Sequence, residues 1–209
     1  MDTPEIADAA LQWRLLDLET ADAHHFDVTE FVTQVALPRL AQMGRRIEFE
    51  LVDSAEPQKA WVSFGENKLF VREDIWVAAQ RGLPMARVVV AHELGHLALH
   101  SDQVFAFTQP ATYGHLQQGQ SAEFQANWFA WAFLLPDAVL LRSRNRGLNE
   151  SSIATIALVP EKLVEKRIEQ VALDKRYRKY AGDQCPLCGQ ELQQNGVTME
   201  CDCGYQVTC

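Results

Sequence analysis

The stretch Val88–His100 constrains the chain more than any other part of its sequence. It is an apolar run interrupted by three histidines, one glutamate and one glycine. In an α-helix, positions four residues apart differ by about 40° in direction and about 6 Å along the axis. His92 and His96 would therefore lie on one stripe, where both imidazoles can bind a single ion. We interpret the stretch as a buried helix that carries a metal site.

Glu93 has the position of a general base rather than that of a ligand. It lies about 100° further round the helix than His92, where it can touch a metal-bound water from the side. A divalent metal lowers the pKa of its bound water, and a nearby carboxylate then takes the proton as the water attacks a carbonyl. A lone histidine or glutamate on an apolar helix is usually structural. Three of the six histidines within nine residues, with a glutamate at this offset, favour the metal site.

A catalytic zinc site commonly uses three protein ligands, so a third ligand must come from elsewhere. His100 is eight residues from His92, which is about 12 Å of helix axis and too far for one tetrahedral centre. We interpret His100 as a helix-end histidine.

Glu123 is the stronger candidate for the third ligand. It lies in a second apolar helix, expected at 121–136, and Asn127 follows one turn later on the same face. Asn127 would accept a hydrogen bond from the second ring nitrogen of a metal-bound histidine. Alternatively, Glu123 is an acid in the first turn after an N-cap at Ser121, where it favours the helix dipole. The two roles are compatible.

These motifs resemble those of the ImmA/IrrE metallopeptidases, a gluzincin-like group. The resemblance rests on residues 91–100, 123–130 and 134–136, and it extends over about residues 26–172. It implies a cytoplasmic bacterial or phage endopeptidase that cleaves a helix-turn-helix repressor. It also implies the same metal ligands and catalytic base, namely His92, His96, Glu123 and Glu93.

The length, charge and cysteine positions of the chain indicate its domain organisation and its compartment. A chain of 209 residues that is 47% hydrophobic is expected to form one main domain with a small appendage. Residues 1–140 carry a net charge of −10 and residues 141–180 a net charge of +5. We expect neither export nor a membrane span, because no basic segment precedes an apolar core and no apolar run approaches about 20 residues. All five cysteines follow residue 184, which favours a reducing cytoplasm.

Apolar periodicity predicts helices and a small sheet before the metal helix. Asp27 or Thr29 is expected to cap the second helix, and an adjacent histidine pair, His24-His25, is assigned no role. The expected helices are 4–20, 27–43, 73–80 and 84–99, and the expected strands are 47–51, 61–64 and 68–71.

The strands 61–64 and 68–71 flank the turn Gly65-Glu66-Asn67, so we expect a mainly antiparallel sheet. The hairpin 61–71 is either a peptide-binding edge that receives substrate by strand addition or an ordinary core hairpin. Residues 101–120 read as a loop near the site. In that loop, Tyr113 and His115 are candidates for stabilising an oxyanion, with exposed loop residues as the alternative.

Residues 142–147 read as a basic hinge, and residues 148–171 as a helix-turn-helix-like pair. The basic excess admits DNA contact. Acidic side chains at 161, 165 and 169 would repel a phosphate backbone, so we interpret the pair as protein-docking or structural.

The tail contains two short cysteine pairs, each followed by a glycine, that resemble a zinc ribbon. The predicted structural zinc ligands are Cys185, Cys188, Cys201 and Cys203. The second pair has one residue between its cysteines where two are usual, Cys209 is left unassigned, and disulfide formation is the alternative.

Together these observations predict an α+β metallopeptidase with a metallopeptidase domain at 1–141, a helical segment at 142–180 and a ribbon-like tail at 181–209. The resemblance implies that the activity is zinc-dependent endoproteolysis of a helix-turn-helix repressor, and manganese is an alternative metal. The alternative function is a non-proteolytic regulator or antitoxin-type binding module with the same fold. A purely structural metal is disfavoured, because such a site needs no base beside its ligands.

Overall fold

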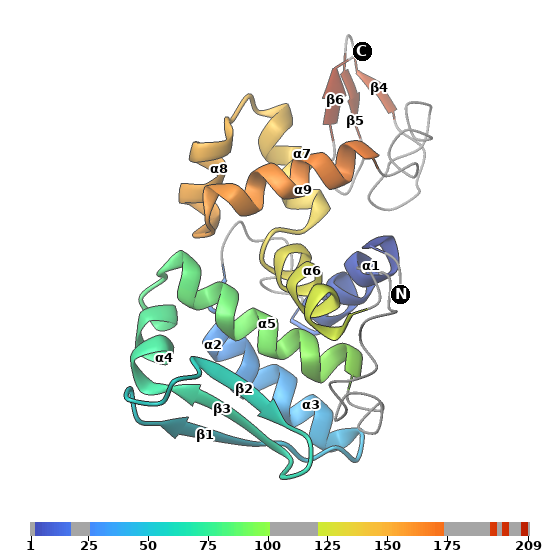
Figure 1. The fold of residues 1–209 in the computed structure, drawn as a ribbon. Helices are drawn as coiled ribbons and strands as arrows, with labels where there is room; N and C mark the ends of the chain where they lie inside the picture. The colour runs from blue at the N-terminus through green and yellow to red at the C-terminus, as the bar shows by residue number, and fades with distance from the viewer. Residues whose placement is uncertain are drawn as a thin grey trace.

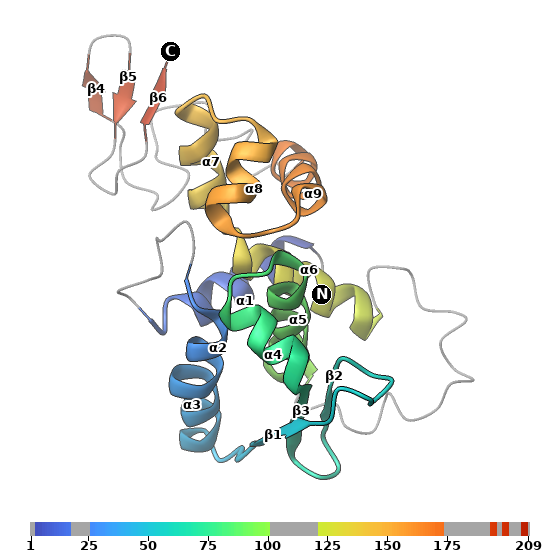
Figure 2. The ribbon, with the colours of Figure 1, turned by 90° about the vertical axis from the view of Figure 1, so that its left-hand side faces the viewer.

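The computed structural model describes residues 3–17, 26–100 and 121–173, together with three short strands of the tail. The main body is helical and carries a small sheet, which confirms the α+β class. Figure 1 shows helix α5 crossing the middle of the molecule, with the sheet on one side and helices α7, α8 and α9 on the other. The same order appears in the perpendicular view of Figure 2. None of the described helices is long and apolar enough to cross a membrane.

Both predicted N-terminal helices are present, but the first ends at Arg14, because residues 15–17 form a turn, and it is therefore shorter than the predicted 4–20. Helix α1 spans Thr3–Arg14, and a continuous helical segment runs through α2 (Val28–Glu30), the π-helix η1 (Phe31–Ala36) and α3 (Leu37–Gln42). Asp27 is the N-cap, because its carboxylate accepts from the backbone N–H groups of Thr29 and Glu30 at 2.8 and 3.1 Å. The widened π turns lie directly before Pro38, which cannot donate an α-helical bond and crowds the preceding turn.

The sheet of the main body has three strands, β1 (Glu48–Val52), β2 (Ala60–Ser63) and β3 (Lys68–Arg72), in the order β1-β3-β2. Strands β2 and β3 form the predicted antiparallel hairpin, with Asn67 at φ 54° in the turn. Strand β1 pairs parallel to β3, so the prediction of a mainly antiparallel sheet is wrong for this pair. The chain reverses twice between β1 and β3, and β1 lies on the far side of β3 from β2.

Helix α4 spans Glu73–Gln80 as predicted, and α5 spans Pro84–His100, one residue longer than predicted. Gly82 makes the turn between them with φ +78°. Helix α6 spans Ala122–Leu134 and packs along α5. Ser121 caps α6 by accepting from the Phe124 N–H at 3.1 Å, as predicted.

Helices α7 (Asp137–Asn145), α8 (Glu150–Ala157) and α9 (Glu161–Leu173) follow. The predicted hinge at 142–147 is wrong in its first part, because α7 continues through Asn145 and the turn itself is Arg146-Gly147. The predicted helix pair is present as α8 and α9, joined at Leu158 in a left-handed conformation with φ 51°. The tail strands β4 (Gln193–Asn195), β5 (Thr198–Glu200) and β6 (Gln206–Thr208) pair antiparallel.

One buried apolar cluster joins these elements from Ile6 in α1 to Val171 in α9. Three buried arginines connect parts of this cluster by donating hydrogen bonds to backbone carbonyls. Several of these carbonyls lie at the C-terminal ends of helices, where a positive charge is favourable. Arg14 donates to the Phe133 carbonyl at 2.7 Å, and Arg167 contacts the Leu135 carbonyl at 3.3 Å.

Arg87 connects two separate segments to helix α5. Its guanidinium donates to the carbonyls of Ala157 and Leu158 at 2.7 and 2.6 Å and to the Phe26 carbonyl at 2.8 Å. Burial lowers its pKa to about 10, against the opposing charge of Asp27, so the guanidinium stays charged at neutral pH. The C-terminal helices are therefore bonded directly to the helix of the two histidines.

Candidate metal and catalytic centre

His92 and His96 lie one turn apart on α5 and direct their rings to one point. Their Nε2 atoms are 3.0 Å apart, and their ring centres are 4.7 Å apart. Both side chains are partly buried, with 17% and 15% of their surface exposed. Two nitrogens this close on one helix face can bind the same ion.

Glu123 meets both histidines from the first turn of α6. Its two carboxylate oxygens lie 3.3 Å from Nε2 of His92 and 3.3 Å from Nε2 of His96. Within the described ranges, these three residues offer ligand atoms that all lie within 4.8 Å of one another. Two imidazole nitrogens and a carboxylate are a donor set that zinc uses. The residues present therefore fit a divalent ion.

Gly95 is what brings α6 close enough to α5 for this meeting. A Cβ built on Gly95 would lie 3.0 Å from both the Cα and the carbonyl oxygen of Ala126, and 3.2 Å from Cβ of Phe129. These neighbours belong mainly to the backbone, which cannot rotate aside. The glycine thus places the first turn of α6, and with it Glu123, over the histidine face.

Asn127 of helix α6 lies beside the His92 ring. Its side-chain Oδ1 is 3.1 Å from Nδ1 of His92. When Nδ1 carries the proton and donates to this oxygen, the Nε2 lone pair is left for a bound ion.

Hydrogen bonds and neighbouring charges shift the pKa values of Glu123 and His92. Hydrogen bonds from His92 and then His96 hold the pKa of the Glu123 carboxyl well below its usual range. Burial lowers the pKa of His92, but Glu123, Glu93 and Asn127 together outweigh burial and raise it. Glu123 is therefore an anion, as a carboxylate ligand must be.

Glu93 lies on the same helix but faces strand β2. Only 7% of the residue is exposed. Burial raises the pKa of its carboxyl, while the neighbouring His92 and His96 oppose this rise. The backbone N–H of Val62 in β2 donates to the carboxylate. Glu93 is thus a buried, basic carboxylate between the histidine pair and the edge of the sheet.

The comparison with known protein families agrees with this geometry. The model of the Peptidase_M78 family, described as the IrrE N-terminal-like domain, matches residues 53–169. This chain belongs to the Peptidase_M78 family. The family is metal-dependent, so a metallopeptidase-type function is supported. No curated protein and no solved structure matches the chain.

The M78 match begins in the loop before β2, which is the strand beside α5. Strand β2 is an edge of the sheet. The Arg72 N–H donates to the Lys59 carbonyl at 2.9 Å, and hydrogen-bonded pairs alternate along an antiparallel ladder. Trp61 and Ser63 therefore bond to β3, whereas Ala60 and Val62 direct their backbone groups to the open edge, on the side of Glu93.

His100 is the last residue of α5 and takes no part in the ligand group, in agreement with its interpretation as a helix-end histidine. Its residue is 3% exposed, and its ring donates to the Ala122 carbonyl. Burial lowers its pKa to about 4. His100 therefore stays neutral and supports the contact between α5 and α6.

Several predicted site residues lie outside the described residues. These are Tyr113 and His115 in the loop 101–120, and Cys185, Cys188, Cys201 and Cys203 in the tail. Two features of this M78 centre were not predicted, the Val62 N–H and the spacing role of Gly95. A glycine inside an otherwise apolar helix indicates close packing. The role of a backbone N–H cannot be predicted from residue types, because every residue except proline has one.

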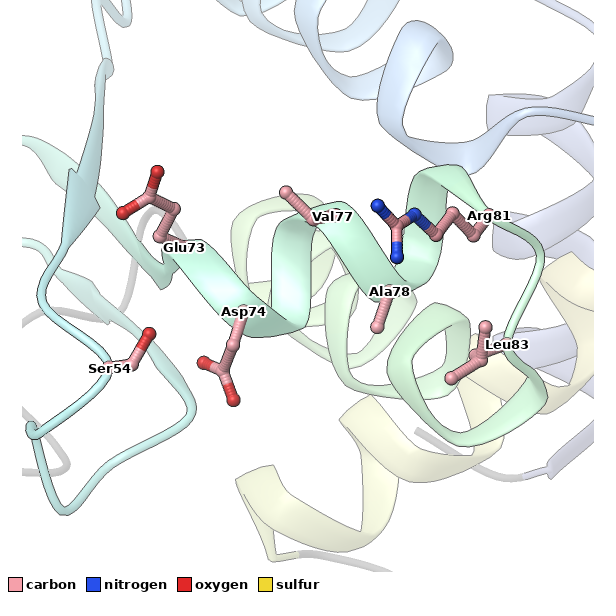
Figure 3. A pocket seen from close by; sticks show the side chains of 7 residues that line it. All are labelled: Ser54, Glu73, Asp74, Val77, Ala78, Arg81 and Leu83. Atoms are coloured by element: carbon pink, nitrogen blue, oxygen red, sulfur yellow. The ribbon is translucent and has the colours of Figure 1, made fainter.

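A shallow hollow of about 420 Å³ lies elsewhere on the molecule, over helix α4. Figure 3 shows the acidic side chains of Glu73 and Asp74 towards one end and those of Arg81 and Leu83 towards the other. Its lining shares no residue with the ligand group. We assign the hollow no part in the metal centre.

Proposed function

We propose that this M78 protein is a zinc-dependent endopeptidase, with His92, His96 and Glu123 as metal ligands and Glu93 as catalytic base. The observation that carries the proposal is the position of one carboxylate against both Nε2 atoms, at 3.3 Å each, beside a second, buried carboxylate. Structural sites need ligands and no base. Manganese suits the same donors and is the alternative metal.

When bound, a divalent ion acidifies water and polarises the scissile carbonyl. Glu93 takes the proton from the attacking water on a carboxylate oxygen and passes it to the leaving amine. Burial raises the pKa of the Glu93 carboxyl, which favours transfer of a proton to it from the attacking water. Asn127 holds the His92 ring through Nδ1.

The substrate lies along β2 as an added strand. Ala60 and Val62 present backbone groups at the open edge, and the Val62 N–H already reaches Glu93. A peptide bonded to this edge passes beside the base, and main-chain bonds of this kind accept many sequences.

The proposed physiological substrate is a cytoplasmic helix-turn-helix repressor, whose cleavage switches genes on. The acidic 1–140 region, with a net charge of −10, complements a basic DNA-binding protein. Ion pairs of Lys162 with Glu165 and of Lys166 with Glu169, at 2.8 and 2.7 Å, neutralise charge along α9, which disfavours direct binding of this helix to DNA.

The test incubates the metal-loaded protein with candidate repressors and compares it with Glu93→Gln by mass spectrometry. The amide keeps the shape of the side chain but cannot accept the proton, so Glu93→Gln should bind metal and leave the repressor intact. Cleavage by both forms would remove Glu93 from its role. Displacement of an intact repressor from DNA by both forms would establish the non-proteolytic regulator instead.

We also propose a structural zinc in the tail, bound by Cys185, Cys188, Cys201 and Cys203. The support is two short cysteine pairs in a chain whose thiols all lie in this tail. A chain ending at Gly182 should lose one metal equivalent and keep its peptidase fold. An intramolecular disulfide without metal, found after reducing purification, would contradict the proposal.

A further inference from the structure

The outer face of the sheet carries an aromatic pair next to the open edge of β2. Leu69 and Val71 of β3 point into the core with 0% exposure, so the alternating residues of β3 point outward. Trp61 pairs with Phe70 in the strand register and therefore shares this outer face. The two rings are stacked, with centres 4.7 Å apart and planes inclined by 20°.

Two cations beside this pair are held in ion pairs, and the Lys68 Nζ also lies 5.6 Å from the centre of the Phe70 ring. Lys68 binds Glu50 at 2.7 Å, and Arg72 binds Asp74 at 2.7 Å. Both Trp61 and Phe70 stay partly exposed. The feature that this face offers to a ligand is therefore an apolar aromatic surface rather than a charge.

The register of β2 with β3 places this aromatic surface beside the path of a peptide that adds to the open edge of β2 as a strand. The backbone groups of Trp61 are directed to Phe70. On the open side, Trp61 therefore occupies a position without ladder hydrogen bonds. In an antiparallel pair, residues at such positions approach most closely, to about 4.5 Å between Cα atoms. The peptide residue opposite Trp61 must direct its side chain to the same outer face.

We propose that Trp61, supported by Phe70, is a specificity-determining residue for the peptide substrate. It selects extended peptides with a bulky apolar or aromatic side chain at the position opposite Trp61. This inference rests on the proposed peptidase function and on strand addition to β2. Aromatic cross-strand contacts of this type correspond to about two- to tenfold in affinity.

The experiment digests a complex peptide library with wild-type protein, Trp61→Ala and Trp61→Phe, and identifies the cleavage products by mass spectrometry. Wild type should prefer bulky apolar residues at one fixed distance from the scissile bond, by about two- to tenfold over alanine. Trp61→Ala should lose this preference, so that the ratio of its rates on peptides with a bulky apolar residue and with alanine at this position falls to about one. Trp61→Phe should retain the preference, because it keeps the aromatic surface.

Two results would overturn the inference. One is an unchanged preference in Trp61→Ala, and the other is an equal fall in rate for every peptide, which indicates a structural role. Circular dichroism of each variant checks folding.

A binding measurement separates this inference from the proposed function. In the Glu93→Gln background, fluorescence anisotropy compares two matched labelled peptides with phenylalanine or alanine at the tested position. If wild type cleaves nothing in the library but this affinity ratio is present and needs Trp61, the specificity surface stands and the peptidase proposal fails. If the ratio is absent, or survives in Trp61→Ala, the inference is wrong whatever the protein cleaves.

Discussion

At the scale of single residues, the centre depends on which ring nitrogen of His92 carries the proton. The Asn127 Oδ1 lies 3.1 Å from Nδ1 and can only accept a hydrogen bond, so the tautomer with the proton on Nδ1 leaves the Nε2 lone pair for a metal ion. The side-chain oxygen of Asn127 is a hydrogen-bond acceptor, and alanine has no such group.

Asn127→Ala is therefore expected to weaken metal affinity by about 10- to 100-fold. Competition with a chelator of known affinity measures the change. Gln80→Ala is the control, because it removes an exposed amide from helix α4 that is not part of the ligand group. Equal affinities for the two variants would show that Asn127 does not orient the ring.

A second prediction at the residue scale concerns the effect of His100 on the stability of the fold in acid. Its folded pKa is about 4, below the ordinary value of 6.5, because it is buried. Between these values the unfolded chain binds the proton and the folded chain does not, so stability falls as pH drops from 6.5 towards 4. The shift corresponds to at most about 3 kcal/mol.

The measurement compares urea unfolding of metal-free wild type and His100→Gln at pH 7 and pH 4.5. Gln can still donate to the Ala122 carbonyl but does not titrate. The free energy of unfolding should fall more steeply with acid in wild type than in the variant. Parallel pH profiles would contradict this role for His100.

At the scale of elements, the packing of α5 against α6 determines the position of Glu123. Gly95→Ala adds a Cβ at 3.0 Å from the Ala126 backbone. This overpacking should destabilise the fold by about 1–3 kcal/mol and weaken metal binding, because α6 must move away from the histidines.

Gly65→Ala is the control, since its Cβ would meet nothing within 4 Å. It should leave the free energy of unfolding nearly unchanged. Urea unfolding and chelator competition on both variants give the comparison. If the metal affinity of Gly95→Ala equals that of Gly65→Ala, the spacing of the helices does not position Glu123.

The elements also show what the sequence could predict. The helix α4, Glu73–Gln80, and the histidine pair were predictable because their patterns are local. Glu123 was found through a motif on another helix, together with Asn127 on its face. The parallel pairing of β1 with β3 was missed, because alternation reports which face a strand buries and not which neighbour it joins.

At the scale of the whole molecule, Arg87 bonds the C-terminal helices to the metal helix. Its guanidinium is 1% exposed and reaches three carbonyls from two distant segments. The periodicity that located α8 and α9 gave no sign of this connection, because an arginine reads as a surface residue unless its partners are known.

Arg87→Met is expected to destabilise the protein by about 3 kcal/mol or more, because it leaves buried carbonyls without donors. Arg87→Lys should not restore stability, since one ammonium cannot reproduce the planar fork. Chemical denaturation measures both variants, and Arg81→Met on the exposed preceding turn is the control. A loss as small as that of Arg81→Met would show that the helices are held by apolar contacts alone.

The open edge of β2 has a consequence for the protein in concentrated solution. An unpaired strand beside an active centre is also a template on which a second copy of the chain can align its own edge. Here the strand is four residues long, and the Val62 N–H is already engaged by Glu93. A short edge of this kind limits pairing between two copies, and the groups that it leaves open, on Ala60 and the Val62 carbonyl, are those that the proposed substrate strand would use.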